Sequence, residues 1–124
     1  MADGEASSWL VGRSFRIVAI DGVAALEQPT AEITFGMDGR VTGRATVNRF
    51  AGPYALDGPV LTLGPLAGTL MAGPPEAMEQ EQRLHRALAR SLTVVPVAGG
   101  GRVELRDGED VVLLLVATEP LEQI

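Results

Sequence analysis

Three Asp-Gly pairs, each placed between runs of alternating apolar and polar residues, most constrain what this chain can fold into. They are Asp38-Gly39, Asp57-Gly58 and Asp107-Gly108. Asp-Gly in that setting indicates a β-hairpin, because a type I′ turn needs positive φ at both central residues. Three hairpins in chain order favour an antiparallel meander over parallel β-α-β units. We expect strands at residues 15–20, 31–35, 41–48, 54–56, 60–63, 93–97, 102–106 and 111–117, with a looser glycine turn at 99–101.

One stretch breaks the β pattern. Pro74 and Pro75 can open a helix, because proline's missing N–H is not needed in the first turn. We therefore predict a helix within residues 74–92. The fold class expected is α+β, a curved antiparallel sheet or partly closed barrel of about seven to eight strands with one α-helix packed on it. The length fits a single domain at 9–124, preceded by a flexible N-terminal lead-in at 1–8.

Glu81 is the most informative single residue of the predicted helix. Helical winding at about 100° per residue places it on the apolar face with Ala77, Leu84 and Leu88. Because a buried carboxylate needs hydrogen-bond donors, we expect a structural role for it. The expected donors are the Thr69 hydroxyl or the backbone N–H groups of residues 69–72. Asn48 or an arginine of the 43–50 strand is the second choice.

Composition excludes several classes of site. There are no cysteines, so disulfides, thiol nucleophiles and zinc-thiolate sites are excluded. The formal net charge of -6 argues against non-specific binding to nucleic acid or anionic lipid, and no run of basic residues indicates a basic patch. No apolar run approaches the length of a transmembrane helix, and the N-terminus has no signal-peptide pattern.

No catalytic, cofactor-binding or metal-binding residue is predicted. His85 is the only histidine, and a single histidine at the edge of a helix face is an ordinary structural residue. Asn48 has two interpretations: an amide that satisfies backbone groups where its strand bends into residues 50–53, or a ligand-contacting amide. The acidic residues near the last hairpin lack the spacing of a calcium loop, and no serine lies in a Gly-x-Ser-x-Gly elbow. The acidic residues are Glu104, Asp107, Glu109 and Asp110. The serines are Ser7, Ser8, Ser14 and Ser91.

Several separated motifs, in order and at consistent spacing, resemble the META domain or HslJ-like family of bacterial proteins. They are Gly43, Val47-Asn48-Arg49-Phe50, Gly52-Pro53-Tyr54, Thr69-Leu70-Met71-Ala72 and residues 77–81 with Leu84 and Leu88. The resemblance extends from about Trp9 to Ala117. The family often has cysteines where Val47 and Gly73 stand here. Their joint absence predicts that these two positions lie close enough for a cysteine pair, within about 7 Å between Cα atoms.

The resemblance implies a β-rich domain with one helix and no enzymatic activity. It implies a stress- or envelope-associated domain that binds a protein, a peptide or a small hydrophobic compound. The alternative is a cytoplasmic regulatory or inhibitor module with a protein partner, and an uncharacterised hydrolase is the third option. We expect a periplasmic or envelope location if a precursor signal was trimmed, and a cytoplasmic one otherwise.

Overall fold

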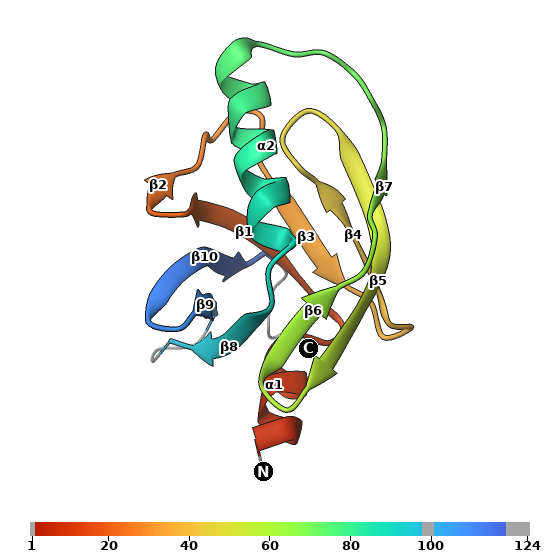
Figure 1. Ribbon diagram of the computed structural model, residues 1–124, viewed down its shortest axis with the longest axis vertical. Coiled ribbons are helices and arrows are strands. Elements are labelled where there is room, and N and C mark those ends of the chain that lie inside the picture. The colour runs from red at the N-terminus through yellow and green to blue at the C-terminus, as the bar shows by residue number, and fades with distance from the viewer. Residues whose placement is uncertain (1, 98–100, 119–124) are drawn as a thin grey trace.

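The computed structural model describes residues 2–97 and 101–118, with side chains from Ala6 onward. Within these residues ten strands form one antiparallel sheet, and eight of them close into a barrel in the order β10-β9-β8-β6-β5-β4-β3-β1 (Figure 1). β1 pairs back to β10, while β2 pairs with β1 and β7 with β5. The predicted α+β fold is therefore confirmed. The strands are β1 Arg13–Ile20, β2 Val23–Ala24, β3 Glu32–Phe35, β4 Arg40–Arg44, β5 Arg49–Asp57, β6 Val60–Leu63, β7 Ala67–Gly68, β8 Leu92–Pro96, β9 Arg102–Asp107 and β10 Asp110–Ala117.

The three Asp-Gly pairs lie at hairpin tips, as predicted, but none forms the expected type I′ turn. At Asp57-Gly58 and Asp107-Gly108 the aspartate ends its strand and pairs with the residue three positions later. Only the glycine then has positive φ, +60° and +65°, as in the first central position of a type II′ turn. Both residues of Asp21-Gly22, between β1 and β2, do have positive φ, +54° and +82°. The glycine turn predicted at 99–101 lies largely outside the described residues.

The predicted helix is confirmed as α2, Pro75–Leu88. Pro74 precedes it with extended backbone, and Glu76 lies in the first turn, where a carboxylate favours the helix dipole. The N-terminal segment differs from its prediction. Instead of a flexible lead-in, Ala2–Leu10 form a short helix, α1, because Ala6 and Leu10 are apolar enough to be buried in the core. Neither helix of the described chain is long and apolar enough to cross a membrane.

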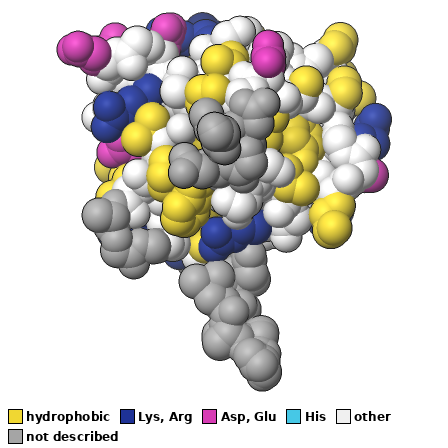
Figure 2. All heavy atoms as spheres, turned by 90° about the horizontal axis from the view of Figure 1, so that it is seen from below, with side chains coloured by type: hydrophobic (Ala, Val, Ile, Leu, Met, Phe, Trp, Pro, Cys, Tyr) yellow, Lys and Arg dark blue, Asp and Glu magenta, His cyan; other side chains and the backbone are white. Residues whose placement is uncertain are grey.

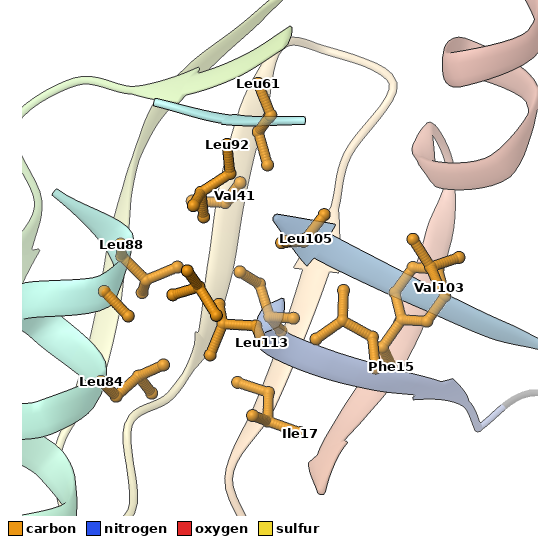
Figure 3. Packing of buried hydrophobic residues seen from close by; sticks show 14 of the residues in the cluster. Phe15, Ile17, Val41, Leu61, Leu84, Leu88, Leu92, Val103, Leu105 and Leu113 are labelled. Atoms are coloured by element: carbon orange, nitrogen blue, oxygen red, sulfur yellow. The ribbon is translucent and has the colours of Figure 1, made fainter. Parts of the chain in front are cut away.

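The barrel interior is filled by aliphatic and aromatic side chains. Figure 3 shows Leu84 and Leu88 of α2 directed toward Leu113 and Ile17 of the barrel strands. α1 lies at the bottom of Figure 1 and α2 in its upper part, so the two helices cover different regions of the barrel. This apolar packing holds the buried face of α2 against the barrel strands.

The chain reverses earlier than predicted between β4 and β5. The strand expected at 41–48 ends at Arg44, and the bend expected at 50–53 is absent because these residues belong to β5. Phe50 and Gly52 face the interior and alternate with outward-facing Arg49 and Pro53. This alternation, rather than the turn propensity of Gly-Pro, decides the local structure.

Candidate functional site

The turn between β4 and β5 is a two-residue loop, Thr46–Val47, closed by a hydrogen bond from Ala45 N to Asn48 O of 2.7 Å. Thr46 has φ of +146°, an unusual backbone conformation for a β-branched residue, and is fully buried. In an ordinary hairpin of this length the N–H of residue 48 would donate to the carbonyl of residue 45. Here that N–H is directed at a side chain of α2 instead.

Glu81 is the acceptor. Its Oε1 accepts the backbone N–H groups of Val47 at 2.9 Å and Asn48 at 3.0 Å, and its Oε2 accepts the Asn48 side-chain amide at 2.7 Å. The side chain is 6% exposed, so the predicted burial is observed. The donors are the second choice of the sequence analysis, Asn48, together with Val47; the Thr69 hydroxyl does not reach the carboxylate.

Asn48 connects Glu81 to the segment that leads into α2. Its Nδ2 donates to Met71 O at 3.0 Å, and its Oδ1 accepts Met71 N at 2.6 Å and the Thr69 hydroxyl at 2.8 Å. Thr69 Oγ1 in turn accepts Arg49 N at 3.0 Å. The structure therefore brings Asn48, Thr69 and Glu81 into one hydrogen-bond network, which we call the polar network.

Gln80 and Thr46 extend the polar network and were missed in the sequence analysis. Gln80 Nε2 donates to the Thr46 hydroxyl at 3.0 Å, and its Oε1 accepts Leu26 N at 2.8 Å. Gln80 is 2% exposed. Its spacing from Ala77 and Leu84 places it on the buried helix face, so helical periodicity contained this information. No sequence pattern indicates the backbone conformation of Thr46.

Hydrogen bonding keeps Glu81 ionised. Burial raises the pKa of its carboxyl, but the hydrogen bonds from Asn48 and Val47 and the nearby His85 lower it by more, so the pKa lies below its ordinary value of 4.5. A carboxylate that already accepts three N–H donors and has a lowered pKa is poorly suited to general base catalysis near neutral pH. The polar network therefore serves to position the backbone of Val47, Asn48 and Met71.

The other residues considered from the sequence are dispersed. His85 is exposed, and its ring meets the edge of Phe50 with centroids 6.2 Å apart. Glu104 and Asp107 form ion pairs with Arg106 and Arg90. Ser14 Oγ lies 2.7 Å from Thr34 Oγ1. Across residues 2–97 and 101–118, no three acidic or histidine side chains are arranged to hold a metal ion.

Val47 and Gly73 are adjacent, which confirms their predicted proximity. A Cβ atom placed on Gly73 would lie 3.5 Å from Val47 Cβ and 2.6 Å from its Cγ2. The first distance is within the range of about 3.5–4.5 Å seen in disulfides. The second is too short for a methyl group, so the valine side chain occupies the space that a second side chain would need.

The surface above the polar network is apolar. Leu70 is 97% exposed and Met71 is 55% exposed, although Met71's backbone is held on both sides by Asn48. Close to α2's C-terminal end there is also a cleft of about 410 Å³. It is lined by Leu63, Gly64, Pro65, Leu66, His85, Leu88 and Ala89.

Comparison with known proteins agrees with the fold. A family model described as the META domain matches residues 8–120. An NMR structure of a protein from Burkholderia xenovorans superposes with a TM-score of 0.73 at 24% identity, covering 94% of this chain and 88% of that one. A second NMR structure gives 0.68 at 23% identity, covering 88% and 92%. No curated protein matches the sequence.

Proposed function

Because this chain belongs to the META domain family, whose model matches nearly all of it, we propose that it is a non-catalytic domain that binds a partner protein through Leu70 and Met71. The proposal includes the stress- or envelope-associated setting that the family suggests. A cytoplasmic regulatory or inhibitor module with a protein partner is the alternative, and cell fractionation of the native protein distinguishes the two.

One observation carries the proposal: the backbone of Met71 is held by two part-buried hydrogen bonds to the buried Asn48, while Leu70 and Met71 are themselves exposed. Asn48 binds both the N–H and the carbonyl of Met71, and Glu81 holds Asn48 in place. Ordering a loop on binding costs free energy, so an apolar pair presented on a pre-ordered segment binds with less loss of entropy. The polar network thus stabilises a binding surface as well as a hairpin.

Exposure alone does not identify a binding surface. Single exposed hydrophobic side chains are normal in soluble domains, and Met37 is 84% exposed in the β3–β4 turn. Figure 2 likewise shows hydrophobic side chains reaching the surface at the lower end of the molecule. Leu70 and Met71 differ because they are adjacent in the chain and share one anchored segment. Met37 therefore serves as the matched control.

The test compares three immobilised baits in native extract: wild type, Leu70→Ser/Met71→Ser, and Met37→Ser. Quantitative mass spectrometry should show a protein retained by wild type and Met37→Ser and depleted about tenfold on the double variant, a loss of about 1.4 kcal/mol. Unchanged NMR spectra of the barrel core would show that the variants are folded. Equal recovery on all three baits would contradict a role for this surface.

A small hydrophobic ligand is the second candidate, because three leucines, Leu63, Leu66 and Leu88, are among the residues that line the cleft near the end of α2. Its volume of about 410 Å³ is within the range of small-molecule sites. Ala89→Trp would fill it without touching Leu70 or Met71. Loss of an apolar fluorescent probe from that variant, with partner capture unchanged, would assign ligand binding to the cleft.

A further inference from the structure

Three arginines and one glutamate form a row across the outside of the barrel. Arg16 of β1 pairs with Glu32 of β3, Glu32 pairs with Arg44 of β4, and Arg44 pairs with Arg49 of β5. All four side chains are exposed. We call this set the arginine row. Other residue types separate these positions in the sequence, so no run of basic residues indicates them.

The arginine row carries unbalanced positive charge in an acidic protein. Directly opposed residues on neighbouring antiparallel strands have Cβ atoms about 4.5–5.5 Å apart, so Arg44 and Arg49 repel one another. Within the described ranges, none of the ion pairs involves Arg16, Arg44 or Arg49. The chain has 16 acidic residues, and of these only Glu32 lies within the row.

The arginine row lies next to the segment that carries the exposed residues Leu70 and Met71. Arg49 O accepts Thr69 N at 3.1 Å and Arg49 N donates to the Thr69 hydroxyl at 3.0 Å, which fixes Thr69 beside the row. Leu70 and Met71 follow at once. The exposed residues Arg44 and Arg49 and the exposed pair Leu70 and Met71 therefore lie on neighbouring segments of the chain.

We propose that this surface binds an acidic segment of a partner protein, with carboxylates at Arg44 and Arg49 and an apolar side chain against Leu70 and Met71. The inference rests on the proposed protein-binding function and names the chemistry of the partner. Guanidinium groups bind carboxylates through paired N–H donors, and two arginines side by side accommodate adjacent acidic residues. The cost of keeping like charges opposed is offset when the partner supplies the missing anions.

Charge also favours a peptide over a nucleic acid or an anionic membrane. Those ligands present phosphates over a wide area and would meet the negative charge of the rest of the chain, which totals -6. A short acidic segment contacts only the arginine row, and charges farther than about 8 Å are screened at physiological ionic strength. The local positive charge then decides the interaction.

The experiment uses ¹⁵N-labelled protein and a blocked peptide of Glu and Leu residues, with the same peptide carrying Gln for Glu as a control. Addition of the Glu peptide should shift the amide signals of Arg44, Arg49, Leu70 and Met71, and the Gln peptide should bind about tenfold more weakly. Arg44→Glu/Arg49→Glu should lose the Glu peptide. Arg86→Glu/Arg102→Glu makes the same charge change at exposed positions elsewhere and should bind as wild type does.

Each other outcome overturns the inference. No binding of the Glu peptide to wild type, or equal loss in both double variants, would remove the arginine row as a specific site. Arginine-dependent binding of phosphatidylglycerol vesicles or an oligonucleotide, without peptide binding, would assign it to another class of partner. If Leu70→Ser/Met71→Ser loses its captured protein while Arg44→Glu/Arg49→Glu retains it, the proposed function stands and the acidic partner does not.

Discussion

Asn48 donates a hydrogen bond to each oxygen of the Glu81 carboxylate, from its backbone N–H at 3.0 Å and from its side-chain amide at 2.7 Å. A helix side chain thereby replaces the carbonyl that would ordinarily close the β4–β5 turn. The side-chain amide of Asn48 also donates from Nδ2 to Met71 O and accepts at Oδ1 from Met71 N. The hairpin, the helix and the segment before the helix are consequently stabilised together.

Removing the carboxylate should destabilise the protein. Glu81→Ala leaves the N–H groups of Val47 and Asn48 without their acceptor, which costs about 1–3 kcal/mol in the free energy of unfolding. Glu81→Gln keeps one acceptor and should lose less. Glu79 is exposed on the same helix, so Glu79→Ala should change stability by less than about 0.5 kcal/mol. Urea denaturation of the three variants measures these differences, and equal stability of the two alanine variants would contradict a structural role for Glu81.

Stability should also depend on pH through Glu81. Its folded-state pKa is lowered, so the unfolded chain takes up a proton at higher pH than the folded protein does. The stabilisation is complete above the ordinary pKa of 4.5 and is lost as pH falls through the folded-state value. The stability difference between wild type and Glu81→Gln should therefore narrow below about pH 4.5. A difference that stays constant from neutral pH into this range would show that the carboxylate's charge is not involved.

The fold was predictable because its main determinants are local. Hairpin positions follow from Asp-Gly between alternating runs, and α2 from its prolines and apolar spacing. Turn type was not predictable, since it depends on whether Asp57 and Asp107 end their strands by pairing, a matter of register. α1 was missed because two buried residues, Ala6 and Leu10, give too weak a pattern to separate a short helix from an irregular segment.

The site was predictable in part. Helical spacing placed Glu81 on the buried face, and the same spacing includes Gln80. The first choice of donor, the Thr69 hydroxyl or the backbone of residues 69–72, was wrong, whereas the second choice, Asn48, is confirmed. Glu81 meets the β4–β5 turn, and the position of that turn required knowing that β5 begins at Arg49. The arginine row could not be predicted from the sequence or its net charge. It forms only because strand pairing brings Arg16, Arg44 and Arg49 together from three strands.

A disulfide should form between positions 47 and 73. Val47→Cys removes the methyl group that lies 2.6 Å from a Cβ atom at Gly73, and the two Cβ atoms would then be 3.5 Å apart. In Val47→Cys/Gly73→Cys the closed loop should raise the free energy of unfolding by about 3.5 kcal/mol in the chain-entropy model. Mass spectrometry after mild oxidation, with and without a thiol-alkylating reagent, detects the bond. Two free thiols in the folded double variant would contradict the predicted geometry.

Reversing one charge in the arginine row should stabilise the protein while weakening binding. Arg49→Glu would place a carboxylate opposite Arg44, replacing a repulsive cross-strand pair by an attractive one. We expect the free energy of unfolding to rise by about 0.5–1 kcal/mol at low ionic strength. Arg49→Gln, which only removes the repulsion, should lie between the two. Added salt should reduce the gain, because exposed charges are screened.

Thermal and urea denaturation in low and high salt measure this effect, and Arg102→Glu on β9 provides the control for overall charge. If Arg49→Glu is less stable than wild type at low salt, Arg44 and Arg49 do not repel one another appreciably. A stabilised variant that no longer binds the Glu peptide would instead show that the opposed arginines are retained at a cost in stability for binding. That combination is the expected result, because only an anionic partner relieves the repulsion without changing the sequence.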